Sequence, residues 1–386
     1  MNQHDATALA AVRSAVGRDL AASSSQGLAD LIRSEHLAYG ETAIHELATA
    51  ARHEIYGAGP LQRYLDDPQV TDVLVNGCDS VWIDRGRGLE PVPSGFASDD
   101  QLRALAVRLA AQAGSRLDDS SPTVDGRLPD GTRLHALLAP VSESPALISL
   151  RTLRQRAITL PELVASGTIP KQWEPVLRAI VDRRLNFLVS GATGTGKTTL
   201  LSALLSLVPT TQRIITIEES REIRPNHPHV IALETKKANV EGRGAIGQSE
   251  LLRNALRMRP DRIVVGECRG GELAEMLSAL NTGHEGGCGT IHANSACDVP
   301  ARLHALGALS TMTPEAVTLQ SAAAIDIVLH VRREPHPAWA STRYVAELAL
   351  LEQVGGTLQV RPALTWHNRD ELTAGPGYPE LLERLK

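Results

Sequence analysis

The spacing of hydrophobic and polar residues changes along the chain, and these changes divide it into segments. Between residues 56 and 155 most apolar runs are short and bounded by Gly, Pro or Asp, as in VTDVLVNG, SVWIDRG, TVDGRL, TRLHALL and ALISLRTL. Such runs predict strands joined by tight turns. The stretch DDQLRALAVRLAAQAG instead has helical spacing, with Ser98 or Asp99 as the expected N-cap and Gly114 at its end. We therefore expect a small α+β domain at residues 51–155.

Two other segments have helical character throughout. Residues 1–50 are rich in alanine and interrupted by SSSQG, which predicts a short helical N-terminal extension that packs or docks and carries no chemistry. Residues 156–185 contain TLPELVASG and PVLRAIVDRR, which predict a linker with connecting helices. Neither segment carries a motif for a reaction.

Residues 186–386 begin with short apolar strands that alternate with segments of helical period or glycine. The strands are NFLVSG, RIITIE, HVIALE and RIVVG. This alternation predicts a parallel sheet in an α/β domain. The last part adds a helix and three strands, which we expect to form an antiparallel C-terminal extension.

Composition limits the classes of function. At 386 residues and 42% hydrophobic, the chain can form two or three domains with cores of their own. The formal net charge of -5 and the 3% aromatic content give no basic channel and no stacking surface, so we expect no direct DNA binding. The four cysteines form no compact disulfide pattern, and no apolar run approaches the roughly 18 residues needed to span a bilayer. We expect a cytoplasmic protein, held at a membrane only by a partner.

The segment SGATGTGKTT is the most specific motif in the chain. It fits G-x-x-x-x-G-K-[ST], and it lies between an apolar strand and the helical stretch TTLLSALLSLV, as a phosphate-binding P-loop requires. Backbone N–H groups of such a loop face the phosphates, the lysine reaches the β- and γ-oxygens, and the Ser or Thr hydroxyl binds magnesium. No guanine-reading N-K-x-D element follows, so we expect ATP with Mg²⁺. The predicted binding residues are Gly191, Ala192, Thr193, Gly194, Thr195, Gly196, Lys197, Thr198 and Thr199.

Carboxylates follow two of the predicted strands. Glu218 and Glu219 end RIITIE, and Glu267 follows RIVVG, where Gly266 occupies the position at which P-loop enzymes usually have an aspartate. The carboxyl ends of parallel strands meet at one edge of a sheet, beside the P-loop. We therefore expect these glutamates to orient water and magnesium, with Gly266 leaving room beside the phosphate.

The segment TGHEGGCGTIHANS contains His284, Cys288 and His292, and its spacing allows a zinc site if the segment is helical. The GGCG stretch disfavours a helix, and GTIHA has the character of a strand. We expect no zinc. The alternative is that His284 and His292 contact the nucleotide, where a histidine near the γ-phosphate can report hydrolysis.

Taken together, these motifs resemble those of the secretion-ATPase superfamily of type II and type IV secretion. The resemblance rests on YGAGPLQRYLDDPQVTDVLVNG, VDGRLPDGTRLHALLAPV, GATGTGKTTLL, ITIEESREI and LLRNALRMRPDRIVVGECRG through ALNTGHEGGCGTIHANS, and it is greatest for the CpaF/TadA branch, which drives Flp/Tad pilus assembly. It implies a RecA-like P-loop ATPase domain preceded by a smaller, sensor-like α+β domain, with ATP between them. It also implies a homo-hexamer that works with a polytopic inner-membrane platform protein.

The resemblance also assigns roles to single residues. TIEES corresponds to the Asp box, Glu267 to the Walker B glutamate, and His284 and His292 to the His box. Glu218 is then expected to act on the water and Glu219, which stands where the family usually has aspartate, to lie nearer to magnesium.

The charge that develops on the γ-phosphate requires a cation beyond Lys197. By the same resemblance, Arg133 and Arg151 are expected to supply it, with Arg127 as a weaker candidate. The alternative is that these arginines pair with surface carboxylates such as Asp125 or Asp130.

Two other functions fit a P-loop chain. A nucleic-acid motor can share a RecA-like core, although the composition gives it no binding surface. A nucleotide-binding regulator without catalysis is the other, since Glu219 and Gly266 depart from the usual residues. Retention of Lys197, Glu218 and Glu267 favours the ATPase.

Overall fold

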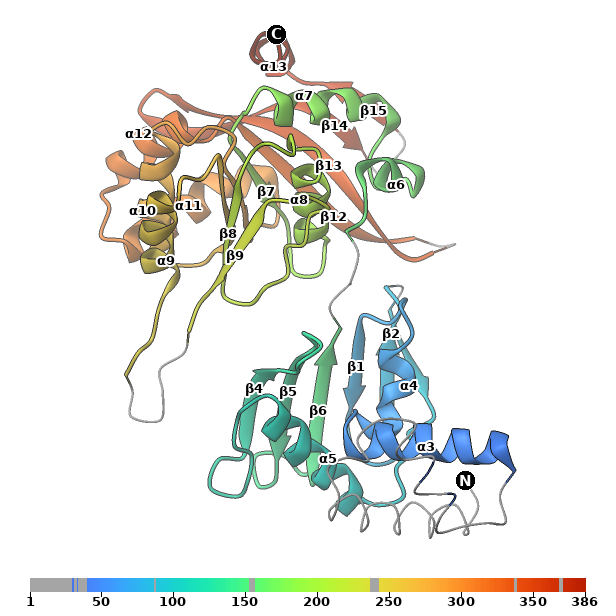
Figure 1. The fold of residues 1–386 in the computed structure, drawn as a ribbon. Coiled ribbons are helices and arrows are strands. Elements are labelled where there is room, and N and C mark those ends of the chain that lie inside the picture. The colour runs from blue at the N-terminus through green and yellow to red at the C-terminus, as the bar shows by residue number, and fades with distance from the viewer. Residues whose placement is uncertain are drawn as a thin grey trace. The chain divides into compact units, whose positions relative to one another are not determined.

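The computed structural model describes residues 30, 33, 40–86, 88–152, 157–236, 243–336, 339–367 and 371–386. The chain forms two compact units, Met1–Arg154 and Gln155–Lys386 (Figure 1). Most of the expected helical extension at residues 1–50 lies outside the described residues, and helix α3 (Glu41–Ile55) is the first element with full bounds in them. Within these ranges, no helix is both long and apolar enough to cross a bilayer.

The first unit is built on a six-stranded sheet in the order β3-β2-β1-β6-β5-β4, with every neighbouring pair antiparallel. Strand β3 was not expected from the sequence. In this unit the short helix α4 (Gln62–Leu65) precedes the first strand. The strands are β1 (Asp72–Val75), β2 (Val81–Asp84), β3 (Leu89–Val92), β4 (Thr123–Arg127), β5 (Arg133–Leu138) and β6 (Ala146–Arg151).

Helix α5 (Asp99–Gln112) covers this sheet because its apolar stripe and the inward residues of the strands share one core. Leu105 and Leu109 of the helix are buried with Leu134 and Ile148 of the sheet. Of the two expected N-caps, Ser98 is the one used, since its hydroxyl accepts the N–H of Gln101. The predicted α+β fold of this segment is confirmed.

The second unit contains a nine-stranded sheet in the order β15-β14-β13-β12-β7-β11-β10-β8-β9. From β12 to β9 the neighbours are parallel, and β13, β14 and β15 extend the sheet antiparallel. The predicted parallel sheet with an antiparallel extension is therefore confirmed, with one correction: the first of the three strands expected in the extension, β12, pairs parallel with β7. The strands are β7 (Phe187–Ser190), β8 (Ile214–Glu218), β9 (Val230–Glu234), β10 (Arg262–Cys268), β11 (Cys288–Ile291), β12 (Ile327–His336), β13 (Trp339–Val354), β14 (Thr357–His367) and β15 (Glu371–Ala374).

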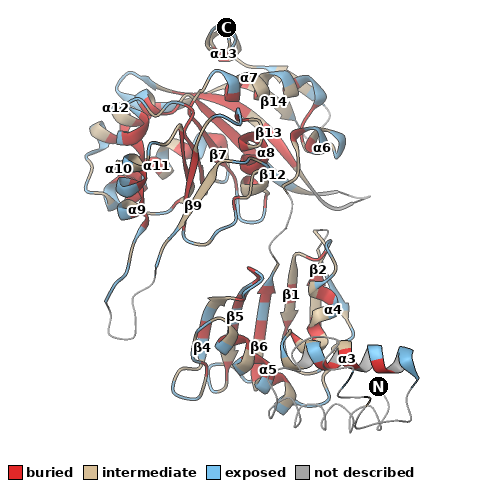
Figure 2. Cartoon of the chain, viewed as in Figure 1, coloured by how far each residue is buried: buried red, intermediate tan, exposed pale blue. Residues whose placement is uncertain are grey.

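Helices cover both faces of this sheet, which is why its central strands are apolar on both sides (Figure 2). In β7, Phe187 and Val189 face one core cluster and Leu188 the other. The helices on the first face are α6 (Leu160–Ala165), α7 (Glu174–Asp182), α8 (Lys197–Leu205) and α13 (Tyr378–Arg384). Those on the second are α9 (Gln248–Ala255), α10 (Glu272–Leu280), α11 (Val299–Leu309) and α12 (Pro314–Ala324).

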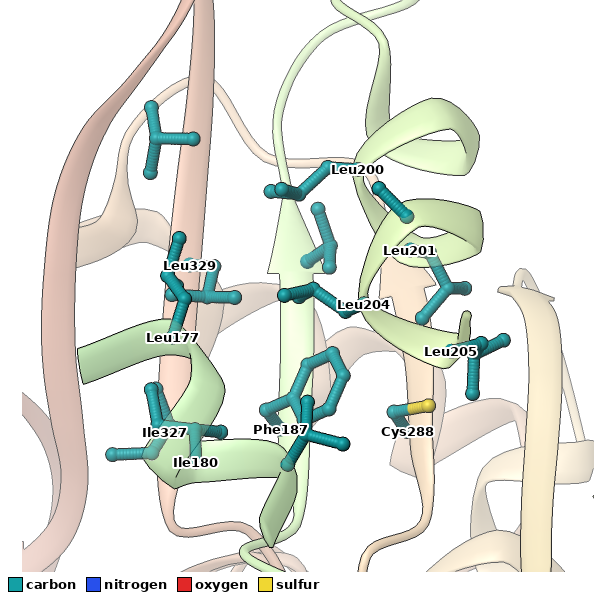
Figure 3. Close-up of a cluster of buried hydrophobic side chains, with 14 of the residues drawn as sticks. Leu177, Ile180, Phe187, Leu200, Leu201, Leu204, Leu205, Cys288, Ile327 and Leu329 are labelled. Carbon is teal, nitrogen blue, oxygen red and sulfur yellow. The ribbon is translucent and has the colours of Figure 1, made fainter. Parts of the chain in front are cut away.

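The segment expected to be a linker, residues 156–185, contributes directly to the first of these cores. Leu177 and Ile180 of α7 are buried in one cluster with Phe187 of β7 and Leu204 of α8 (Figure 3). Helix α6 begins with a capping box in which Thr159 and Glu162 satisfy each other's backbone N–H groups. These helices therefore support the strand and helix on either side of the P-loop.

Candidate active site

The P-loop motif occupies the turn between β7 and α8. Gly191, Gly194 and Gly196 have φ values of 153°, 73° and 95°, which favour glycine. The loop also lies tightly against the neighbouring strand, since a Cβ on Gly191 would be 2.5 Å from the carbonyl oxygen of Val331. The strand and the helix that the motif requires on either side are thus both present.

Lys197 lies within this loop and is only 8% exposed. Its Nζ donates to the carbonyl oxygens of Gly191 at 3.0 Å and Ala192 at 2.9 Å. The Thr195 hydroxyl also donates to Ala192 O, at 2.9 Å. Burial lowers the pKa of Lys197 from its ordinary value. The ammonium group is therefore held by the loop that would bind phosphate.

A continuous line of polar contacts leads from Lys197 to Glu219. Lys197 Nζ lies 3.3 Å from His292 Nδ1, and His292 Nε2 contacts Glu267 Oε1. Arg269 then joins the two acids, with Nη2 at 2.7 Å from Glu267 Oε2 and Nη1 at 2.9 Å from Glu219 Oε2. Because β7, β8, β10 and β11 are parallel, the carboxyl ends of all four strands meet here. The structure brings together four predicted residues and one that was not predicted.

Arg269 is the residue that sequence reasoning missed. The hydrogen bond that Arg269 donates to Glu267 raises the pKa of the guanidinium, so it stays charged between the two carboxylates. A cation two residues beyond Glu267, in GECRG, was the available signal. Burial and the charge of Lys197 lower the pKa of His292, which favours the neutral ring.

Glu218 has a different environment from its neighbour Glu219. It is 4% exposed, and its Oε1 accepts the backbone N–H groups of Glu222 at 2.8 Å and Ile223 at 2.9 Å. The carboxylate thus holds the turn that follows β8. The water-orienting role expected for Glu218 stays a prediction.

Gly266 is explained by the position of Glu218. A Cβ on Gly266 would lie 2.6 Å from Glu218 Cγ, closer than real atoms approach. On the other side, the Thr290 hydroxyl donates to Gly266 O at 2.6 Å. The space expected beside a phosphate is filled by the Glu218 side chain, so the glycine allows a glutamate to be buried on the adjacent strand.

Substitution of Gly266 by alanine should therefore destabilise the fold by about 1–3 kcal/mol, because the methyl group overlaps Glu218 in a packed interior. Unfolding in urea measures the loss. Gly271→Ala is the matched control, since a Cβ at Gly271 has no neighbour within 4 Å. Equal midpoints for the two variants would contradict this explanation of Gly266.

Burial raises the pKa of Glu218 to about 7, against about 4.3 for an unfolded chain. The folded state then binds this proton more tightly, so the contribution of Glu218 to stability is full below pH about 4 and is lost as the pH rises through 7. Glu218→Gln removes the titration and keeps an acceptor for the two N–H groups. From pH 5 to pH 8 the wild type should lose about 2–3 kcal/mol of unfolding free energy that the Glu218→Gln variant keeps. Parallel pH profiles from urea unfolding would contradict the raised pKa.

The structure does not bring His284 to this edge of the sheet. His284 precedes β11 and His292 follows it, so the strand separates them, and His284 Nδ1 lies 3.1 Å from Ala279 O. The expectation that both histidines bind the nucleotide is corrected for His284. Cys288 is buried within the strand, and no three His, Cys, Asp or Glu side chains among the described residues are placed to hold a metal ion.

The three arginines of the first unit form a row across its sheet. In register, Arg127 on β4 lies opposite Arg133 on β5, which lies opposite Arg151 on β6. Arg133 Nε is 3.5 Å from Asp125 Oδ1, and Arg151 Nε is 3.0 Å from Asp72 Oδ1. Arg133 thus makes the carboxylate pairing that was the alternative to a catalytic role. The side chains of Arg133 and Arg151 are each about half exposed.

Comparison with known proteins agrees with this arrangement. A putative conjugal transfer protein of Mycobacterium tuberculosis is 46% identical over 334 residues, covering 85% of this chain and 93% of its own. The type IV secretion system protein PtlH of Bordetella pertussis is 34% identical over 262 residues, covering 61% of this chain and 76% of its own. The X-ray structure of the Legionella pneumophila ATPase DotB matches with a TM-score of 0.56 at 20% identity, covering 75% of this chain and 79% of DotB, and shows the same fold.

The family model described as "Type II/IV secretion system protein" matches residues 54–340, which include both sheets' central strands and the whole P-loop edge. The resemblance seen in the sequence motifs is thus confirmed at the level of the family, while the CpaF/TadA branch stays a prediction. By this match and by its relatives, the chain belongs to the type II/IV secretion system protein family.

Proposed function

We propose that this protein is a magnesium-dependent ATPase that powers a secretion or pilus machine. The observation that carries the proposal is the line of contacts from Lys197 through His292 and Glu267 to Arg269 and Glu219 beside the P-loop. The P-loop lysine, two carboxylates and a second cation lie together at one edge of one sheet, which supports the proposal. Phosphoryl transfer to water requires this combination.

Each residue of the line has a role in this proposal. The N–H groups of residues 192–198 and the Lys197 ammonium bind the phosphates. The Thr198 hydroxyl and the Glu219 carboxylate offer the oxygen ligands that Mg²⁺ prefers, and bound Mg²⁺ would neutralise developing charge. Glu267 accepts a proton from the attacking water. The neutral ring of His292 donates or accepts a hydrogen bond beside Glu267.

Arg269 gives this site a way to respond to its nucleotide. The guanidinium pairs with both Glu267 and Glu219, so it competes with any metal ion or water for the same carboxylate oxygens. When those oxygens turn to magnesium or water, Arg269 is released close to the phosphates, where a cation stabilises negative charge.

A second source of positive charge is the row of arginines on the sheet of the first unit, Arg127, Arg133 and Arg151. Like charges directly opposite one another destabilise a sheet, and an anion beside them offsets that cost. We propose that Arg133 and Arg151 meet the nucleotide phosphates in a homo-hexamer, with Arg127 beside them. In this view ATP turnover is coupled to domain motion.

The partner is proposed to be a polytopic protein of the inner membrane, with this chain on the cytoplasmic side. Flp/Tad pilus assembly is the specific machine suggested by the CpaF/TadA motifs. The M. tuberculosis relative is named as a putative conjugal transfer protein and PtlH as a type IV secretion protein, so export of a macromolecule through a type IV machine fits equally.

ATP hydrolysis by the purified protein tests the proposal. We expect turnover that requires Mg²⁺, is unaffected by single- or double-stranded DNA, and increases with assembly into a hexamer. Turnover that depends on DNA would favour a nucleic-acid motor. Nucleotide binding without turnover, with or without vesicles of anionic lipid, would instead indicate a regulator.

A further inference from the structure

The hairpin formed by β12 and β13 lies against the P-loop and brings two arginines to it. Arg343 Nε donates to the carbonyl oxygen of Gly194 at 2.9 Å. The Arg343 Cδ would be 3.4 Å from a Cβ on Gly196, and Arg333 Nη1 would be 3.7 Å from a Cβ on Gly194. Arg333 and Arg343 are directly opposite in the register of the two strands, so their side chains leave the same face.

The hydrogen bond to Gly194 fixes the direction of one peptide group. In a trans peptide the C=O and the following N–H point in opposite directions. Since Gly194 O points to Arg343, the N–H of Thr195 points away from the hairpin. Gly194 has a φ of 73°, in a region where a glycine peptide rotates at little cost. The bond from Arg343 therefore adds a restraint on this N–H to the one that Thr195 has from its own hydroxyl, which donates to Ala192 O at 2.9 Å.

The strand that carries Arg343 is well supported. Around Arg343, β13 pairs with β12, and two residues further on the N–H of Val345 donates to Thr168 O at 2.9 Å. The pairing of β13 with β14 begins at Glu347. The guanidinium is therefore presented from a fixed backbone, as a residue that orients a loop requires.

We propose that Arg343 is a positioning residue that holds the Gly194–Thr195 peptide with its N–H directed at the bound phosphates, while Arg333 adds positive charge. The proposal rests on the proposed ATPase function and adds a cation from the nucleotide-binding unit itself. It acts on the loop and not on the base or ribose. The affinity for any ligand with a pyrophosphate group should depend on it.

Binding of Mg-ADP and of magnesium tripolyphosphate, measured by calorimetry, tests this proposal. Arg343→Met should weaken both ligands by about tenfold, the effect of losing one hydrogen bond from a charged donor. Arg343→Lys should restore part of the affinity. Turnover at saturating ATP should change much less than KM, and hydrogen exchange in residues 191–199 should be faster in Arg343→Met without ligand.

Arg332→Met is the matched control. It lies on the opposite face of the same hairpin, where its Nη1 is 3.7 Å from Glu334 Oε1, and we expect wild-type affinity. Wild-type affinity in Arg343→Met, or an equal loss in Arg332→Met, would overturn the proposal. A loss for Mg-ADP but not for tripolyphosphate would also overturn it, since Arg343 would then contact the nucleoside.

The outcomes separate this proposal from the proposed function. A wild-type protein that hydrolyses ATP together with an unaffected Arg343→Met variant removes only the role of Arg343. A wild-type protein that binds both ligands but does not hydrolyse ATP removes the ATPase, while a tenfold loss in Arg343→Met still supports the positioning role. Failure of the wild type to bind either ligand overturns both.

Discussion

Glu267→Gln should bind Mg-ATP with nearly wild-type affinity and hydrolyse it about 10²–10⁴-fold more slowly, the usual range for loss of a general base. The amide keeps the size of the side chain and can still accept from Arg269, whose Nη2 lies 2.7 Å from Glu267 Oε2. It cannot take up a proton from water. Release of phosphate over a range of ATP concentrations gives kcat and KM separately.

Glu275→Gln is the matched control for this change. Its carboxylate on α10 pairs at 2.6 Å with Arg253 on α9, so the substitution removes an ion pair between two helices, outside the P-loop edge. We expect normal turnover. A Glu267→Gln protein with wild-type kcat would show that another residue activates the water.

Lys197→Ala should lower the affinity for Mg-ATP by about 100-fold or more, because the variant lacks a buried cation that bonds directly to phosphate oxygens. The stability of the nucleotide-free protein should change less than this affinity does. In the structure Lys197 Nζ is held by two carbonyl oxygens of its own loop, and its pKa is lowered by burial, so the free protein already bears a cost for this charge.

Calorimetric titration with Mg-ADP checks the loss, and thermal unfolding without ligand checks the fold. Lys171→Ala removes an exposed lysine of the same unit and serves as the control. Tight binding by a folded Lys197→Ala protein would mean that the motif is not the phosphate site.

Several features of the fold were predictable because they are local. The P-loop is defined within ten residues, and its strand and helix are set by the periodicity on either side. Ser98 and Gly114 mark both ends of α5 through contacts within the helix. The apolar strands predicted a sheet covered on both faces, as the two core clusters show.

The site was predictable only in part. Since parallel strands end at one edge, Glu267 was expected beside the P-loop, and it lies there. His292 was expected near the nucleotide through the resemblance, and it contacts both Lys197 and Glu267. His284 has the same residue type and the same motif as His292, yet it precedes the strand that His292 follows. A spacing of eight residues does not fix the end of the sheet at which a side chain lies unless the limits of the strand are known.

The sequence by itself thus determined the fold class, the P-loop and the glutamates that follow its neighbouring strands. The tertiary structure decided how they are used: Glu218 is buried across Gly266, Arg269 joins Glu267 to Glu219, and Arg343 bonds to Gly194. The physical reason is distance along the chain. Arg343 and Gly194 are 149 residues apart, and Arg269 and Glu219 are 50, so neither contact leaves a periodic or local signal in the sequence. Strand order and register alone bring these side chains together.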